Sequence, residues 1–329
     1  MTRFWHHTSL ACQVLNVGII SGMQNKSALV FIALILVLGI LLSACTSTPT
    51  ETATAELPPT ETSLPATNTP EPTPTETPIP AALTVNGLSI SMAYFQDELS
   101  RYKISFVEGE AIPADPEAIQ TVLDYLTEQV LLASAARTEG YQASSEEIDQ
   151  RIQTLTSQLG SAENLSNWTG ANYYDLEEFR FFIGLGAEAA WKRDKIIATI
   201  PDATEQVRAR QIFSINEIDI NQAYNNLNAG ADFGSLAKQY NPETGGELGW
   251  FPRGYLLVPQ IEEFAFSAGI NAHSPVIQSE IGYHIIEVTD KDPQHPLTTD
   301  AKLSLQAKAL AAWLADAKSN ASITTAVQP

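Results

Sequence analysis

Three polar residues in the C-terminal half of the chain could do chemistry together. Gln211 lies in the strand-like run VRARQIFSI, and Ser279 and His284 lie on either side of a turn in SPVIQSEIGYHIIEV. Histidine and a hydroxyl can hold or move a proton, whereas glutamine donates and accepts hydrogen bonds but does not titrate. A lone histidine on a strand is more often a buried core group, so spacing alone leaves both interpretations open.

Metal and cofactor chemistry is not indicated. His273 and His295 fall in expected loops without ligand spacing, and no hydrolase pattern such as G-x-S-x-G occurs. The two cysteines are Cys12 and Cys45, both near the N-terminus. We therefore expect no metal, no cofactor and no thiolate nucleophile in the folded part.

A set of apolar residues accompanies the polar ones in ELGWFPRGYLLVPQIEEFAF: Leu248, Leu257, Ile261 and Phe266. By spacing alone they favour the core of a small domain, and the second interpretation is an apolar binding site.

Composition excludes some partners. The 329 residues allow about two domains, and 38 acidic residues outnumber 18 basic ones. Nucleic-acid backbones and anionic lipid surfaces both require a basic face, so neither is an expected partner of the folded chain.

The N-terminus predicts an export signal and a tether. Residues 28–42 are an unbroken apolar run, short for a membrane span and typical of a signal-peptide core. The following Leu42-Ser43-Ala44-Cys45 resembles the bacterial lipobox, which implies lipidation at Cys45; a plain transmembrane anchor is the alternative, and Met23 is a plausible start. Residues 46–80 hold nine prolines and no apolar period, which predicts a disordered tether.

Helical patterns follow the tether. A short strand at 84–86 and an Asn-Gly turn lead to a helix from Ser91, and Asp115 is expected to cap a helix that stops at Gly140. Ser144 and Glu147 form a capping-box pattern, and a long helix is expected from about 173 to 199. The last helix, around 299–320, has an apolar face that it cannot bury alone, so we expect it to return to the first helices.

Between these helices the pattern changes to β-α-α-β-α-β-β. A strand begins near Val207, two short helices break at Gly230, and an edge strand spans 247–251. A helix over 258–267 and two strands joined at 279–282 complete this unit.

In order and spacing, VRARQIF, GADFGSLAKQYN, GGELGWFPRG, VPQIEEFAF and SPVIQSEIGYHIIEV resemble parvulin-type (PpiC-type) peptidyl-prolyl cis-trans isomerases. The flanks, opening with VNGLSIS, more loosely resemble the helical part of SurA/PrsA-type extracytoplasmic foldases. The implied fold is α+β: a parvulin-like domain with a four-stranded antiparallel sheet, inserted in an all-α chaperone domain. The expected divisions are a signal peptide (1–44), a tether (45–80), a helical domain (81–204), a parvulin-like domain (205–291) and a returning helix with a tail (292–329).

The resemblance implies roles for the candidate residues. Leu248, Leu257, Ile261 and Phe266 would line the proline slot, with Leu257 where the family usually has methionine. His284 matches the second pocket histidine and Ser279 a hydroxyl position, but Gln211 replaces the first histidine. The loop that usually carries Cys or Asp is shortened to Asn241–Thr244, where Asn241 or Glu243 could substitute.

The implied function is a membrane-tethered isomerase and foldase in the bacterial cell envelope. Its clients would be unfolded or extended chains that contain X-Pro, and Cys45 would anchor it to the membrane. The alternatives are a holdase chaperone or peptide-binding lipoprotein whose parvulin domain is weakly active or inactive, and a structural lipoprotein.

Overall fold

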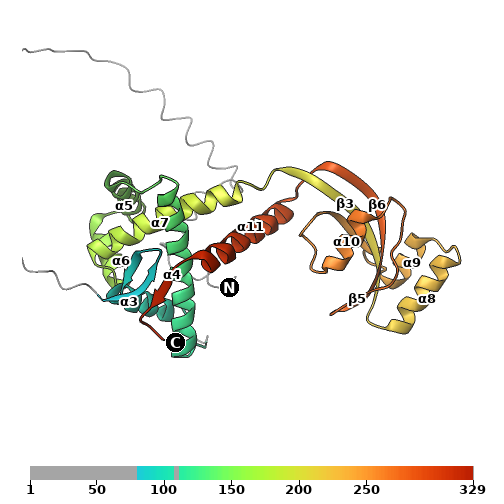
Figure 1. The fold of residues 1–329 in the computed structure, drawn as a ribbon, viewed down its shortest axis with the longest axis horizontal. Coiled ribbons are helices and arrows are strands. Elements are labelled where there is room, and N and C mark those ends of the chain that lie inside the picture. The colour runs from blue at the N-terminus through green and yellow to red at the C-terminus, as the bar shows by residue number, and fades with distance from the viewer. Residues whose placement is uncertain (1–79, 107–110, 329) are drawn as a thin grey trace, which may run out of the picture. The chain divides into compact units, whose positions relative to one another are not determined.

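The computed structural model describes residues 80–106 and 111–328 (Figure 1). The expected signal peptide, Cys45 and all but the last residue of the tether lie outside these ranges. Among the helices of the described ranges, none combines the length and the apolar character needed to span a bilayer.

In the described ranges, the helical part of the chain consists of six helices and a small sheet. The helices are α3 (Met92–Ile104), α4 (Asp115–Thr138), α5 (Ser145–Leu159), α6 (Ala162–Ala171), α7 (Leu176–Ile197) and α11 (Thr299–Asn320). The sheet has the order β2-β1-β7, from β1 (Ala81–Val85), β2 (Leu88–Ser91) and β7 (Ile323–Thr325). The all-α expectation for this part is therefore wrong, because the chain after the last helix pairs with the first strand.

Local signals at the helix ends were mostly predictable. The Ser144 side chain accepts a hydrogen bond from the Glu147 backbone N–H, but the Glu147 carboxylate accepts from Tyr141 and Arg151 instead of completing a capping box. Asp115 is the first residue of α4 rather than its cap, and its carboxylate pairs with Lys103 at 2.6 Å.

The helix expected over 173–199 is shorter and is preceded by α6. Tyr173 has a φ of 58°, a left-handed conformation that ends helical geometry, and Asp175 then caps α7 through the Glu178 backbone N–H. The break is a local feature of the turn that the apolar periodicity did not reveal.

Helix α11 packs on α4 and α7, as its apolar face predicted. Leu132, Ala189 and Ile196 are buried, and Ala309, Leu310, Trp313 and Leu314 of α11 pack against them. Lys318, in the last turn of α11, pairs with Asp124 of α4 at 2.9 Å. Segments far apart in the sequence therefore share one core.

The sheet part holds the elements expected to carry the site. They are β3 (Ala203–Ser214), α8 (Glu217–Asn228), α9 (Phe233–Tyr240), β4 (Glu247–Pro252), α10 (Pro259–Ser267), β5 (Ile277–Ser279) and β6 (Gly282–Pro296). The four strands form an antiparallel sheet in the order β4-β3-β6-β5, which confirms the expected order of elements and sheet.

The alternation of side chains gives this sheet two covered faces. One face packs with α10, through a cluster whose buried members are Val207, Ala209, Phe251, Ile261, Ala265, Phe266, Ile286 and Val288. The other packs with α8 and α9, where the buried members are Ile212, Ile220, Ala223, Leu227, Phe233, Leu236, Ala237 and Ile285. Because Gln211 and Phe213 share parity with Ala209, they belong to the α10 face.

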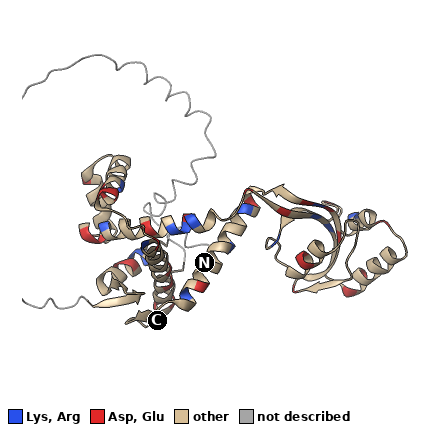
Figure 2. Ribbon diagram, turned by 45° about the horizontal axis from the view of Figure 1, so that its top comes forward, with Lys and Arg blue, Asp and Glu red and all other residues tan. Residues whose placement is uncertain are grey.

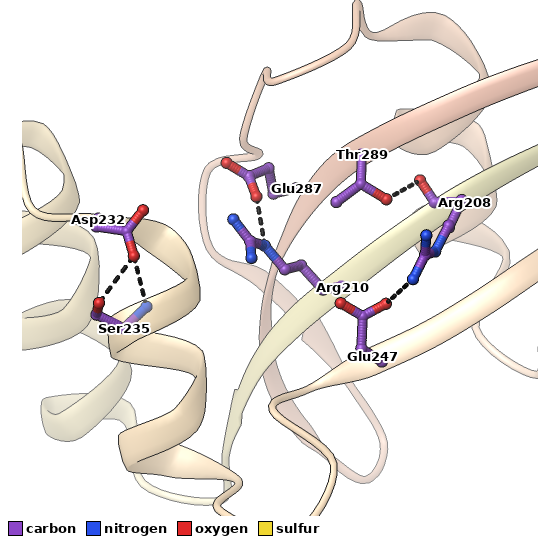
Figure 3. A network of polar contacts seen from close by, with 7 residues as sticks. All are labelled: Arg208, Arg210, Asp232, Ser235, Glu247, Glu287 and Thr289. Carbon is purple, nitrogen blue, oxygen red and sulfur yellow. Dashed lines mark hydrogen bonds and ion pairs between the residues drawn. The ribbon is translucent and has the colours of Figure 1, made fainter.

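Ion pairs hold the α9 side of the sheet (Figure 3). Arg210 donates to Glu287 across β3 and β6 at 2.6 Å, and its guanidinium lies 5.4 Å from the Phe233 ring centroid. Arg208 pairs with Glu247 at 3.3 Å. Both arginines therefore form ion pairs within the sheet, on the face opposite to Gln211.

Basic residues in the described ranges are interspersed with acidic ones (Figure 2). The basic run of α7 is paired: Lys192 and Lys195 contact Glu139, and Arg193 contacts Asp194. These basic side chains of α7 therefore pair with acidic residues of the same chain.

Candidate functional site

The three predicted polar residues meet at one end of the α10 face. The His284 Nδ1 atom lies 3.0 Å from Gln211 Oε1, and its Nε2 atom lies 2.8 Å from Ser279 Oγ. The strands explain the meeting, since His284 pairs with Phe213 on β3 and with Ile277 on β5. Gln211 and Ser279 are each two residues from those partners, so all the side chains project from one face.

His284 is held in a dry environment. It is 2% exposed, and its ring centroid lies 5.0 Å from that of Phe213. Burial lowers the pKa of His284 because the charged imidazolium loses its hydration. Burial therefore favours the neutral form of the imidazole.

Close backbone contacts fix the strands that carry this trio. The Gln211 backbone N–H donates to the Gly246 carbonyl at 2.8 Å, and a Cβ atom at Gly246 would lie 2.0 Å from the Gln211 carbonyl oxygen. A Cβ atom at Gly282 would meet the Phe213 ring and the Ser214 carbonyl at 2.8 Å. Glycine is required at both positions, each of which has a positive φ.

Three of the four predicted slot residues belong to the apolar cluster beside the trio. Ile261 and Phe266 are 4% and 6% exposed, and half-buried Leu248 packs on the same cluster. Leu248 is the extra residue of a β-bulge, because Ala209 pairs with Gly249 and Arg210 pairs with Glu247. The bulge turns Leu248 toward the cluster.

The aromatic Phe266 is partly covered by a cation. The Arg253 guanidinium lies 4.0 Å from the Phe266 ring centroid, and it also pairs with Glu205 at 3.6 Å. Ile261 and Phe266 therefore form the base of the cluster, while Leu248 is more accessible.

Leu257, the fourth predicted slot residue, is 94% exposed and is not part of the cluster. Its neighbour Leu256 is half-buried and packs on the cluster instead. The loop is held by the Glu262 carboxylate of α10, which accepts hydrogen bonds from the backbone N–H groups of Gly254, at 2.7 Å, and of Leu256. These two bonds hold the loop in the conformation in which Leu256 packs on the cluster.

The shortened loop does not supply a further polar group to the trio. Asn241 and Gly245 close it by a backbone hydrogen bond of 2.8 Å, and Glu243 is exposed. Within the described ranges, no hydrogen bond joins the side chain of Asn241 or Glu243 to His284, Gln211 or Ser279.

Sequence reasoning missed two residues of this site. Phe213 could have been found, because it lies two positions after Gln211 on the same strand face. Leu256 could not, since two adjacent leucines in a loop carry no period, and the choice depends on the bonds from Glu262.

The arrangement suits a reaction without bond making or breaking. It offers a neutral hydrogen-bonding trio next to an apolar surface, and the residues in the described ranges hold no group of histidine, cysteine and carboxylate side chains that could bind a metal. Rotation about an X-Pro amide needs no nucleophile; it requires desolvation of the amide and fixed hydrogen bonds to its polar atoms.

Comparisons with known proteins agree with this chemistry. A family model described as PPIC-type PPIASE domain matches residues 202–292. The Foldase protein PrsA of Oceanobacillus iheyensis is 28% identical over 226 residues, covering 64% of this chain and 74% of that protein. The Foldase protein PrsA of Halalkalibacterium halodurans is 31% identical over 235 residues, covering 64% and 65%.

Among solved structures, the peptidylprolyl isomerase PrsA of Bacillus cereus aligns with a TM-score of 0.41 at 22% identity, covering 70% of this chain and 83% of that one. The sequence match alone supports the identification. The chain contains a parvulin-type (PPIC-type) peptidyl-prolyl cis-trans isomerase domain, and over a longer stretch it is similar to PrsA foldases.

Proposed function

We propose that the chain is a membrane-tethered peptidyl-prolyl isomerase and foldase that acts on secreted or envelope proteins. The observation that carries the proposal is the meeting of Ser279, His284 and Gln211 at the edge of an apolar cluster. Its clients are extended or unfolded segments that contain X-Pro bonds.

Catalysis in this proposal comes from the environment of the amide. The barrier to X-Pro rotation in water is about 18–20 kcal/mol. A proline ring that packs on Leu248 and Leu256, above Ile261 and Phe266, brings the amide into a drier environment, and the twisted amide is less dipolar than the planar one. Every 1.36 kcal/mol by which the barrier falls increases the rate about tenfold.

The two adjacent leucines provide a matched test of where the ring binds. Leu256→Asp places a carboxylate on the apolar cluster, whereas Leu257→Asp adds a charge at a position that is 94% exposed. We expect Leu256→Asp to abolish the cis-to-trans rate enhancement on an Ala-Pro peptide, and Leu257→Asp to retain most of it. Circular dichroism checks that both variants are folded.

Three other outcomes of this assay would each lead to a different conclusion. Loss of activity in Leu257→Asp alone would favour the assignment made from the sequence. Equal loss in both would mean that the whole loop contacts the peptide. A folded wild-type protein with no rate above the uncatalysed background of tens of seconds would reject the isomerase proposal.

A holdase is the second candidate, and Gln211 favours it. This residue stands where parvulins usually have a histidine, and the neighbouring loop 241–244 adds no polar group to the trio. A holdase would suppress aggregation of an unfolded client without isomerase activity, and light scattering of such a client measures this directly. A structural lipoprotein would do neither.

The tether and anchor are proposed from residues 28–80 of the sequence. The apolar run and the Leu42–Cys45 motif support lipidation of Cys45, which would place the folded chain outside the cytoplasm at a membrane surface. Mass spectrometry of the membrane fraction should find an acylated N-terminal Cys45. An unmodified chain that retains residues 28–44 would contradict this.

A further inference from the structure

The contacts around His284 demand more protons than a neutral histidine and a serine carry. Gln211 Oε1 only accepts, so the 3.0 Å contact needs a proton on His284 Nδ1. The Gly282 carbonyl also only accepts, so its 3.2 Å contact needs the Ser279 hydroxyl proton. The 2.8 Å contact between Ser279 Oγ and His284 Nε2 then needs a second proton on the ring.

All three bonds form together only if His284 is an imidazolium. His284 is 2% exposed, and its side chain contacts Gln211, Phe213 and Ser279. Among the residues that the structure describes, no carboxylate contacts the ring to offset the hydration that a cation would lose there. The neutral ring therefore leaves one of the three contacts without a proton.

The distances indicate which of the three contacts lacks a proton. The Ser279–His284 contact is the shortest at 2.8 Å, whereas the Ser279–Gly282 contact is the longest at 3.2 Å. The Ile281 backbone N–H also donates to Ser279 Oγ at 3.3 Å, which leaves the hydroxyl proton free to point at the ring. The hydrogen bonds then run in one direction, from Ile281 through Ser279 and His284 to Gln211.

We propose that Gln211 is a positioning residue that fixes His284 as the neutral Nδ1–H tautomer, so that the trio Ser279–His284–Gln211 carries no charge and keeps one hydrogen-bond direction. A histidine at position 211 could titrate or change tautomer, whereas an amide cannot titrate. In the described ranges the NH₂ group of Gln211 makes no hydrogen bond, which leaves it to donate to a bound peptide; this last step rests on the proposed function.

The ionisable residues on the elements around His284 are directed elsewhere. On β3, Arg210 pairs with Glu287 of β6 on the opposite face of the sheet. Glu280, after β5, and Glu263 of α10 are exposed, and Glu262 of α10 accepts the two loop N–H groups. The trio is thus insulated from nearby charge.

The test is ¹⁵N NMR of the imidazole groups in the full chain, with His284 assigned from the signal lost in His284→Asn. We expect a protonated Nδ1, a non-protonated Nε2 and a titration midpoint below that of a free histidine. Gln211→Met removes the acceptor at similar length and should give mixed tautomers. Gln211→Glu adds a carboxylate and should raise the titration midpoint of His284 above that of the wild type.

Gln278→Met is the matched control, because Gln278 is an exposed neighbour on β5. It should leave the His284 signals unchanged. A wild-type His284 with its proton on Nε2, or one that titrates like a free histidine, would overturn the proposal.

Activity provides a separate readout. The kcat/KM of Gln211→Glu on an X-Pro peptide should change at a higher pH than that of the wild type, because the added carboxylate raises the pKa of His284. An inactive protein with the Nδ1–H tautomer would reject the isomerase proposal and retain this one. An active protein whose His284 carries its proton on Nε2 would support the isomerase proposal and reject the proposed tautomer.

Discussion

Replacing Gly246 by alanine tests how the turn immediately before β4 positions Gln211. The new Cβ atom would lie 2.0 Å from the Gln211 carbonyl oxygen, a contact that no rotamer change can relax because the Cβ atom is fixed to its backbone and the oxygen belongs to the backbone. Gly246 also has a φ of 76°, in the left-handed region. The strands must therefore separate at this point.

The expected cost has two parts. A left-handed conformation costs a non-glycine residue about 1–2 kcal/mol. Separation of the strands weakens the hydrogen bond from the Gln211 N–H to the Gly246 carbonyl, which contributes about 1 kcal/mol. We expect Gly246→Ala to lower the free energy of unfolding of the sheet part by about 2–3 kcal/mol in total.

Gly230→Ala is the matched control. Gly230 has a φ of 94°, but a Cβ atom there would meet nothing within 4 Å, so only the conformational cost applies. Amide hydrogen exchange at the buried Ile212 of β3 measures both variants without interference from the helical part. Gly246→Ala should also disturb the His284 NMR signals, and Gly230→Ala should not.

The reasoning would be refuted if the two variants lost equal protection at Ile212. Equal loss would mean that β4 accommodates the Cβ atom without moving Gln211. A Gly246→Ala protein that is less stable but has unchanged His284 signals would show that the β4 contact stabilises the sheet without positioning the trio.

Three further predictions concern stability. Because burial lowers the pKa of His284, the unfolded chain binds a proton more readily than the folded chain does, so the free energy of unfolding should fall as pH drops below about 6.5. His284→Gln should make this fall smaller, as measured by urea titrations at several pH values. Burial raises the pKa of Asp124, but hydrogen bonds from Gln120 and Lys318 lower it, and the net shift is a lowering. The helical part should therefore lose stability as pH falls through the acidic range. In Asp124→Asn this loss, measured by thermal melting, should be smaller. Leu132→Ala, beneath α11, should cost the helical part about 2–5 kcal/mol and leave exchange at Ile212 unchanged.

The order of elements could be predicted because each has a local signal. The alternation around Val207, the glycine at 230 between two helices and the turn at 279–282 all appear in the structure as β3, the α8–α9 break and the β5–β6 turn. The pairing of β7 with β1 could not be predicted, since three residues near the end of the chain carry no period of their own.

The residues of the polar half of the site were predictable from the sequence, but the direction of the hydrogen bonds among them was not. Family order identifies Gln211, Ser279 and His284, and strand parity then requires that they share a face. The sequence does not say which atom of each ring or amide faces the next, because that depends on distances set by the β5–β6 turn and by the Ser279 contact with Gly282.

The apolar half shows the limit of a residue-by-residue resemblance in a loop. The resemblance assigns Leu257 to the slot, yet in the structure the half-buried Leu256 packs on the apolar cluster and Leu257 is exposed. The difference arises because Glu262 binds two backbone N–H groups of the loop, so the helix determines the loop's register. One carboxylate of α10 thus holds the loop in the conformation in which Leu256, and not Leu257, packs on the cluster. We expect Glu262→Gln, which removes the charge, to loosen this loop and expose Leu256 while the sheet stays folded, and amide hydrogen exchange at Gly254 and Leu256 compared with Ile212 measures this.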